Sequence, residues 1–211
     1  MKHIVKAPEP ATFSQWKRCN PNATFRGDLG NHADRASVIA KRDLKDSLLN
    51  EQHGLCCYCE CRVTGNTSHI EHFRPIGIPA FAHLQLEYSN LHASCGLMPG
   101  NGDDEHCGHK KSDVFSPNLI SPLEPDCHLH CAYRMDGTIW GLDVKGSETI
   151  AILHLDSALL NAQRKALIDA FLDYDDDSEL DYSIQRHLDP NRAIIGEFYT
   201  MVEFLHNRNQ L

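Results

Sequence analysis

The sequence predicts an α+β fold in which a small metal-stapled unit of two strands and a helix is embedded in a mainly helical domain. A cysteine-rich stretch with strand and turn residues occupies the middle of the chain, an amphipathic helical pattern precedes it, and further helical patterns follow it. We divide the 211 residues into an amino-terminal arm and helix (1–50), a metal-stapled core (51–115) and a hairpin with a helical carboxyl-terminal region (116–211).

The composition favours a cytoplasmic protein whose cysteines bind metal. No run approaches the roughly 18 apolar residues of a membrane-spanning helix. The start, MKHIVKAPEPATF, lacks the apolar stretch and cleavage site of a signal peptide. Nine cysteines in a reducing compartment indicate metal ligands rather than disulfides. We therefore expect no membrane association.

Charge is distributed unevenly along the chain. The net charge of −9 argues mildly against a nucleic-acid partner, because the phosphate backbone attracts Lys and Arg. However, residues 1–50 carry nine basic and five acidic side chains, whereas residues 112–211 carry seven and seventeen. The acidity is thus concentrated behind the cysteine-rich region.

The first half of the chain predicts a helix, a hairpin and a short helix. After an irregular, proline-containing start, residues 33–52 form a helical pattern. Its apolar stripe comprises Val38, Ile39, Leu44, Leu48 and Leu49. CCYCECRVTGNTSHIEHF then predicts two short strands around a Thr-Gly-Asn-Thr turn. A loop with Pro75 and Pro79 leads to a short helix expected around Leu91 and to a Gly-rich, acidic insertion.

The second half predicts another hairpin and two longer helices. YRMDGTIWGL places Asp136-Gly137 at a hairpin turn. Asp156 can cap a helix that runs to Phe171, and Asp189-Pro190 can start a last helix that buries residues up to Leu205. The acidic stretch DYDDDSELD at 173–181 is either a docking surface or a solvated loop.

A four-cysteine zinc site is the metal centre that the spacing predicts. Cys56 and Cys59 form a C-x-x-C on a tight turn, and Cys95 and Cys107 can close a tetrahedral site, although eleven residues separate them. Such a small unit needs a staple, and a structural zinc contributes on the order of 10 kcal/mol. The alternative is that the cysteines are buried as small apolar residues.

Other cysteines have weaker patterns. Cys57 and Cys61 could substitute in the zinc site, although packing roles are favoured for both. Cys127 and Cys131, with His128 and His130 between them, could form a second, looser metal site. Cys19 receives no role.

Residues that could hydrolyse a phosphodiester lie in HIEHFRP and after it. Glu71 is a carboxylate suited to Mg²⁺, and His72 is a base that can take a proton from water at neutral pH. Pro75 suggests that the strand ends here, so that both could flank one ion-filled cleft. Asn90 would orient the base, and His109 is placed to be a further metal ligand. Lys110 or Lys111 could meet a phosphate.

These motifs resemble the HNH, or ββα-metal, endonucleases. The shared pattern is a C-x-x-C, then Glu71-His72-Phe73-Arg74-Pro75, then Asn90-Leu91, then Cys95, and then the turn from Cys107 to Lys111. The chain is similar above all to the PtuB-type HNH subunits of Septu and retron anti-phage systems, through CCYCE, HIEHFRP, YSNLHASC, CGHKKSD, ISPLEPD and ILHLDSALLNAQRKAL.

The resemblance implies site roles. His72 is the general base, Asn90 the central asparagine, and Glu71 and His109 hold a catalytic Mg²⁺ or Mn²⁺. Arg74, Lys110 and Lys111 bind substrate, while Cys56, Cys59, Cys95 and Cys107 hold structural zinc. Many members have Asn directly after the cysteine of the last turn, where this chain has Gly108.

The resemblance also implies a biological role. The expected activity is metal-dependent cleavage of phage DNA, within a complex that contains an ABC/SMC-type ATPase. If the chain is retron-associated, its partners include a reverse transcriptase and msDNA. Two alternatives remain open: cleavage of RNA such as tRNA, and a catalytically degenerate zinc adaptor, which Gly108 favours.

Overall fold

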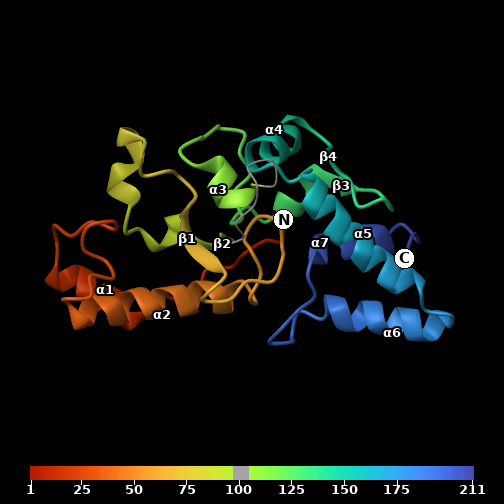
Figure 1. Cartoon of the computed structure of the whole chain (residues 1–211), viewed down its shortest axis with the longest axis horizontal. Coiled ribbons are helices and arrows are strands. Elements are labelled where there is room, and N and C mark those ends of the chain that lie inside the picture. Colours follow the sequence, from red (N-terminus) through yellow and green to blue (C-terminus); the bar gives the residue numbers. More distant parts are fainter. Residues whose placement is uncertain (97–104) are drawn as a thin grey trace.

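The chain folds as an α+β structure in which two small sheets lie among helices (Figure 1). The computed structural model describes residues 1–96 and 105–211, so most of the Gly-rich, acidic insertion lies outside the described residues. The helices are α1 (Ala11–Cys19), α2 (Arg35–Glu51), α3 (Cys107–Lys111), α4 (Val144–Leu153), α5 (Ala158–Leu172), α6 (Asp177–Leu188) and α7 (Tyr199–His206). The strands are β1 (Ser68–His72), β2 (Leu91–Cys95), β3 (Cys131–Tyr133) and β4 (Ile139–Gly141). Within the described ranges, every helix is too short or too polar to cross a membrane.

One end of the molecule is built from α1 and α2 (Figure 1). The helical pattern at 33–52 is confirmed as α2, which starts where the side chain of Asp34 accepts a hydrogen bond from the backbone of Ala36. Its buried face packs against α1 and β2, with Phe13, Leu44 and Leu48 in the shared core. The expectation of an irregular start was wrong for α1, which begins directly after Pro10.

The central sheet pairs β1 with β2 in antiparallel register, with Glu71 opposite His92. The predicted hairpin within residues 56–73 was therefore wrong. The cysteine stretch forms a tight knuckle closed by a bridge between Leu55 and Arg62, and the Thr-Gly-Asn-Thr turn connects this knuckle to β1. The knuckle lies beside the sheet because the Cys57 amide donates to the carbonyl of Ala93.

The helix expected around Leu91 was also wrong. A single 3₁₀ turn at Tyr88–Asn90 leads into β2, and the helix that follows the two strands is α3. The physical reason is pairing: Leu91 and Ala93 bury their side chains against the helical end of the molecule, while β1 takes up the hydrogen bonds of their backbone.

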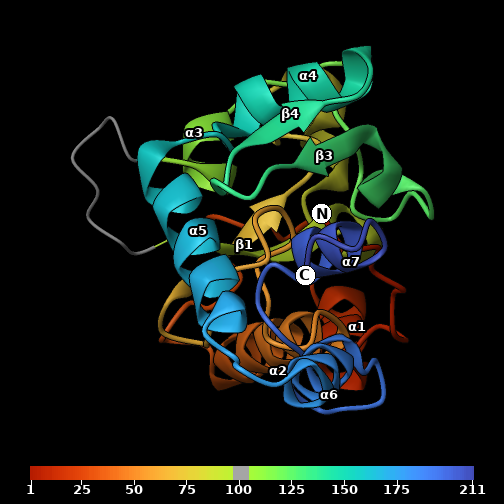
Figure 2. The ribbon, with the colours of Figure 1, turned by 90° about the vertical axis from the view of Figure 1, so that its right-hand side faces the viewer.

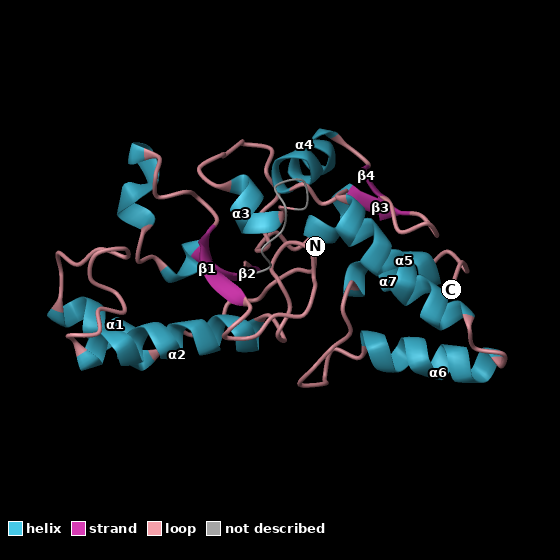
Figure 3. Ribbon diagram, viewed as in Figure 1, coloured by secondary structure: helices cyan, strands magenta, loops and turns pink. Residues whose placement is uncertain are grey.

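The hairpin predicted in the second half is confirmed as β3 and β4, and Asp136 accepts the amide of Thr138 at its turn. Helix α5 is capped by Ser157 rather than Asp156. The last helix begins only at Tyr199, so a helix starting at Asp189-Pro190 was wrong. The acidic stretch is not a plain loop, because Asp176 caps α6 there. Figure 3 shows α5, α6 and α7 at the end opposite to α1 and α2, and Figure 2 looks onto that end, with α4 and the β3–β4 pair at the top.

Buried polar side chains fasten the cysteine knuckle to the rest of the molecule. The amide of Gln52 donates to the carbonyls of Leu55 (2.8 Å) and Ala93 (2.7 Å). Glu60, at a positive φ of 66°, accepts the backbone amide of Thr200 at 2.8 Å. These bonds hold the knuckle between β2 and α7, which sets the position of its cysteines.

Candidate active site and metal centre

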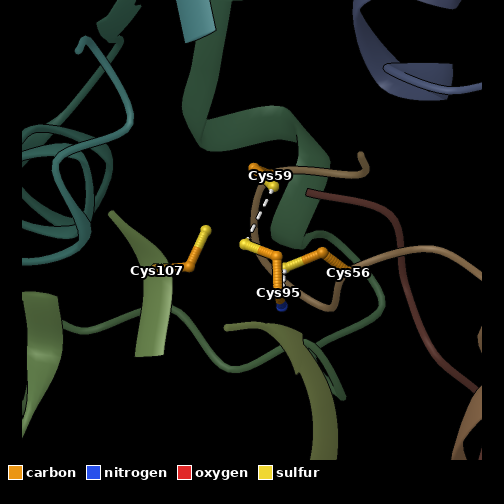
Figure 4. A group of neighbouring side chains, drawn as sticks. All are labelled: Cys56, Cys59, Cys95 and Cys107. Carbon is orange, nitrogen blue, oxygen red and sulfur yellow. Dashed lines mark hydrogen bonds between the residues drawn. The ribbon is translucent and has the colours of Figure 1, made fainter. Parts of the chain in front are cut away.

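Four cysteines from three segments gather in one cluster (Figure 4). Cys56 and Cys59 come from the knuckle, Cys95 from the end of β2 and Cys107 from the start of α3. All four sulfur atoms lie within 4.8 Å of one another, and those of Cys59 and Cys95 are 3.7 Å apart. Thiolates at the corners of a zinc tetrahedron, with Zn–S of about 2.3 Å, lie about 3.8 Å apart. The cluster could therefore hold a zinc ion.

The surroundings of the cluster suit thiolate ligands. The backbone amide of Cys95 donates to the sulfur of Cys56 at 3.3 Å, the kind of outer contact that orients a metal ligand. Hydrogen bonds from the thiols of Cys107 and Cys56 hold the pKa of Cys59 well below its ordinary value. Burial raises the pKa of Cys107.

The remaining cysteines lie outside this cluster. Cys57 is buried and Cys61 points toward Gln163, so neither substitutes in the four-cysteine group. Near Cys127 and Cys131, the described groups that could share an ion are Glu124, Asp126 and His130. The looser second site predicted for the two thiols is thus not formed by them.

The other predicted residues divide between the two faces of the β1–β2 pair. Side chains alternate along a strand, so Glu71 and His72 project to opposite faces. α3 covers the face of Glu71, where the Gly108 amide donates to Ser94 Oγ. The face of His72 turns toward Phe25, whose ring meets the imidazole edge-on at 4.4 Å between centroids. Both residues nevertheless occupy the same end of β1.

Glu71 is buried, and its two carboxylate oxygens have different partners. The ammonium of Lys111 lies 2.8 Å from Oε1, which also accepts the Tyr58 hydroxyl at 3.2 Å. Among the described residues, Oε2 meets Nε2 of His69, at 3.2 Å. Burial acts to raise the pKa of Glu71, but His69 and Lys111 outweigh it and lower the pKa below its ordinary value. Glu71 is therefore ionised in the folded protein.

His72 is held as a neutral base. Its Nε2 lies 3.0 Å from the carbonyl oxygen of Gln85. Because a carbonyl only accepts, Nε2 carries the proton and Nδ1 keeps a lone pair. Burial lowers the pKa of His72 below its ordinary value. Asn90 fixes the loop that supplies the carbonyl, because it bonds both Arg74 and the carbonyl of Leu84.

The predicted substrate-binding residues differ in exposure. Arg74 and Lys110 are exposed, as is His109. Lys111 is almost fully buried, and its ammonium also donates to the carbonyl of His72 at 3.0 Å. A phosphate contact therefore does not fit Lys111, which instead joins α3 to β1.

Three residues that contact Glu71 or His72 could not be identified from the sequence. His69 lies beside Glu71, Gln85 orients His72, and Phe25 brings the exposed Arg26 close enough to lower the pKa of His72 further. Only His69 left a signal: it stands two positions before Glu71, so on a strand both face the same side. The other contacts are backbone or long-range, and no local pattern encodes them.

His92 offers a test of this buried environment. It is fully buried on β2, and neither ring nitrogen has a hydrogen-bond partner among the described residues. Burial lowers the pKa of His92 well below its ordinary value, so it stays neutral when folded but titrates near 6.5 when unfolded. As the pH falls below about 6.5 the unfolded chain gains protons first, which costs the fold up to about 1.4 kcal/mol per pH unit.

We expect His92→Leu to remove this component of acid sensitivity. Urea unfolding at pH 7.5 and pH 5.5 measures it, because the other titrating groups contribute equally to both proteins. The free energy of unfolding should fall less in the variant than in the unmodified chain. Equal losses in the two proteins would contradict the buried, neutral state of His92.

Comparison of the sequence with known proteins places the chain in a family. The chain is 35% identical over 208 residues to the protein named as the HNH endonuclease of retron Ec83 from Escherichia coli, covering 80% of this chain and 79% of that protein. It is 31% identical over 140 residues to the corresponding retron Vc95 protein of Vibrio cholerae serotype O1 biovar El Tor, covering 63% of this chain and 66% of the relative.

A third relative is the Septu protein PtuB of Bacillus thuringiensis, 30% identical over 122 residues. That match covers 57% of this chain but only 44% of PtuB. No protein-family model matches the chain. The identity to the Ec83 protein over most of both chains establishes common descent, and the chain therefore belongs to the family of retron and Septu HNH endonuclease proteins.

Proposed function

We propose that this protein is a metal-dependent HNH endonuclease that hydrolyses phosphodiester bonds of DNA within an anti-phage defence complex. The observation that supports this most is the end of β1. There His72, a neutral histidine oriented by the carbonyl of Gln85, follows Glu71, whose Oε2 is not held by Lys111. The names of the relatives, which belong to retron and Septu systems, support a nuclease role in defence.

Two metals fit the residues that are present. The four-cysteine cluster suits a structural zinc, because its sulfur spacing matches a tetrahedral site. Glu71 is an ionised carboxylate whose Oε2 is not held by Lys111, and such an oxygen suits a catalytic Mg²⁺ or Mn²⁺. A cation bound there would stabilise charge on the phosphate and on the leaving oxygen.

His72 is suited to prepare the attacking water. Its lowered pKa keeps it neutral at pH 7, and Nδ1 is the nitrogen left to take a proton. In-line displacement needs the nucleophile and the leaving group on opposite sides of the phosphorus. A phosphate bound at the end of β1 would have His72 on one face and the cation held by Glu71 on the other. Their opposite orientation therefore supports the mechanism, although it replaces the single cleft expected from sequence.

Exposed cations surround the end of β1. Arg74 and Lys110 are exposed. The charge of Arg26, in the basic amino-terminal arm, helps to lower the pKa of His72. These side chains are the candidates for holding phosphates. The acidic carboxyl-terminal half would repel a nucleic acid, which suits it to docking an ABC/SMC-type ATPase. In a retron, a reverse transcriptase and msDNA would join the complex.

A cleavage assay tests the proposal. The purified chain, alone and co-expressed with an ABC/SMC-type ATPase, is incubated with plasmid DNA, with tRNA, and with Mg²⁺, Mn²⁺ or EDTA. We expect DNA cleavage that needs the divalent ion, and we expect Glu71→Gln to lose it because the neutral amide is a poor cation ligand. Glu87→Gln, at an exposed glutamate, is the matched control.

Two results would redirect the assignment. Cleavage of tRNA with intact plasmid would make RNA the substrate. If Glu71→Gln and His72→Ala still protected cells from phage while Cys56→Ser did not, the protein would be a zinc adaptor rather than an enzyme.

A further inference from the structure

Among the described residues, His69 is the histidine that lies against Oε2 of Glu71. Oε1 of the carboxylate is occupied by the buried ammonium of Lys111 and by the hydroxyl of Tyr58. Oε2 is left to face Nε2 of His69 at 3.2 Å. The protein thus anchors one oxygen and presents the other beside a ring nitrogen.

Two glycines make room for the ring of His69. A Cβ atom at Gly108 would lie 2.6 Å from both Glu71 Oε2 and His69 Nε2, closer than real side chains approach. A Cβ at Gly96 would clash with His69 Nδ1 and would lie 2.7 Å from Nε2 of His109. Any larger residue at position 108 would therefore displace either the imidazole or the carboxylate. The absence of a side chain at Gly108 is therefore what lets the ring of His69 lie beside Glu71.

The distance between the two atoms suits a shared cation. Two neighbouring ligands of an octahedral ion at about 2.1 Å from the metal lie about 3 Å apart, close to the 3.2 Å between His69 Nε2 and Glu71 Oε2. A neutral imidazole can carry its proton on either nitrogen, so Nε2 can serve as a ligand. Nδ1 is buried without a hydrogen-bond partner among the described residues, so a proton moved there displaces no other contact, and bonds to the ion would replace the present contact between Nε2 and Oε2.

His109 is less well placed than sequence spacing predicts. Its Nε2 lies 2.6 Å from the carbonyl oxygen of Gly96 and therefore donates a proton. Its ring lies against that of His69, with 4.6 Å between centroids. His109 is also exposed, whereas the side chain of His69 is only 29% exposed. These contacts make His109 a support for His69.

We infer that His69, with Glu71, binds the catalytic divalent cation, in the space that a side chain at position 108 would otherwise fill. The inference rests on the proposed nuclease function, but it concerns binding of the ion. An imidazole ligand also has a consequence for selectivity, because nitrogen favours transition metals over Mg²⁺. The site should bind Mn²⁺ more tightly than Mg²⁺.

Titration of the zinc-loaded protein with Mn²⁺, followed by electron paramagnetic resonance, tests the assignment. We expect His69→Ala to weaken Mn²⁺ binding at least about tenfold, as loss of a metal-site partner does. His83→Ala, at an exposed histidine of another segment, is the matched control and should leave it unchanged, while His109→Ala should weaken it less than His69→Ala does. Gly108→Asn should also weaken binding in the unmodified chain, because the new side chain meets both Nε2 of His69 and Oε2 of Glu71. Combined with His69→Ala, the same Gly108→Asn change should restore binding and raise the relative affinity for Mg²⁺.

The outcomes separate this inference from the proposed function. Equal Mn²⁺ affinity in His69→Ala and the unmodified chain, or a larger loss in His109→Ala, would overturn the role of His69 even if DNA is cleaved. If Gly108→Asn did not recover affinity in the His69→Ala background, the claim that the His69 ring and a side chain at position 108 compete for one space would be wrong. Mn²⁺ binding that depends on His69 without any cleavage would instead refute the nuclease while leaving the ligand assignment intact. Zinc content and circular dichroism confirm that each variant is folded.

Discussion

Replacement of Cys107 by alanine is expected to abolish zinc binding and to unfold the centre of the molecule. Cys107 is fully buried and joins α3 to the knuckle and β2 through the cluster. A structural zinc contributes on the order of 10 kcal/mol, which is as large as the whole stability of a typical domain. Zinc content by mass spectrometry and thermal unfolding measure the effect: the variant should lack the ion and lose its cooperative transition.

Cys127→Ala is the matched control for this experiment. Cys127 is as buried as the cluster residues, with 1% of its surface exposed, but it lies outside the group of four. It should keep one zinc per chain and lose only about 1–2 kcal/mol of stability, as for removal of a small buried side chain. If Cys107→Ala kept zinc and melted like Cys127→Ala, the cluster would be only a set of packed thiols.

The four-cysteine cluster could be foreseen from the sequence because ligand chemistry is local. A C-x-x-C on a turn constrains its two sulfurs regardless of the fold around it. Cys95 and Cys107 were then the pair that could close the site, although the sequence placed them at a helix end and the following turn rather than at the end of β2 and the start of α3. α2 and the β3–β4 hairpin were equally accessible, since a capped amphipathic pattern and an Asp-Gly turn carry their own signals.

The pairing of the central strands could not be read from the chain in the same way. The turn residues at 64–67 favour a hairpin, but the strand that pairs with β1 comes about twenty residues later. β2 is a five-residue run whose strand character depends on the partner that it meets. The segment around Leu91 resembled a short helix because apolar runs of this length fit both a strand and a helix.

The same limit explains the residues of the candidate site that were missed. Asn90 and His72 were named from sequence, but the carbonyl of Gln85 that connects them is a backbone atom without a residue signature. Gly108 looked like a missing ligand. The structure gives it another meaning, because the space that it leaves open is taken by a side chain from a neighbouring strand.

His72→Ala is expected to have the largest effect on cleavage. Removal of a general base typically costs 10²–10⁴-fold, and the alanine has no nitrogen that could take the proton. Single-turnover cleavage of plasmid DNA at saturating Mn²⁺ isolates this step from binding. His83→Ala changes an exposed histidine of the 3₁₀ helix Pro79–Leu84 and should leave the rate unaltered.

Chemical rescue distinguishes a base from a structural histidine. The His72→Ala change opens a space between Phe25 and the Gln85 carbonyl, the two groups that now hold the ring. Free imidazole can enter this space and accept the same proton, so millimolar imidazole should restore part of the lost rate. The rescued rate should rise with the fraction of neutral imidazole as the pH increases. Undiminished cleavage in His72→Ala would remove His72 from the mechanism, whereas a loss that imidazole cannot reverse would make it a support for the fold of the loop.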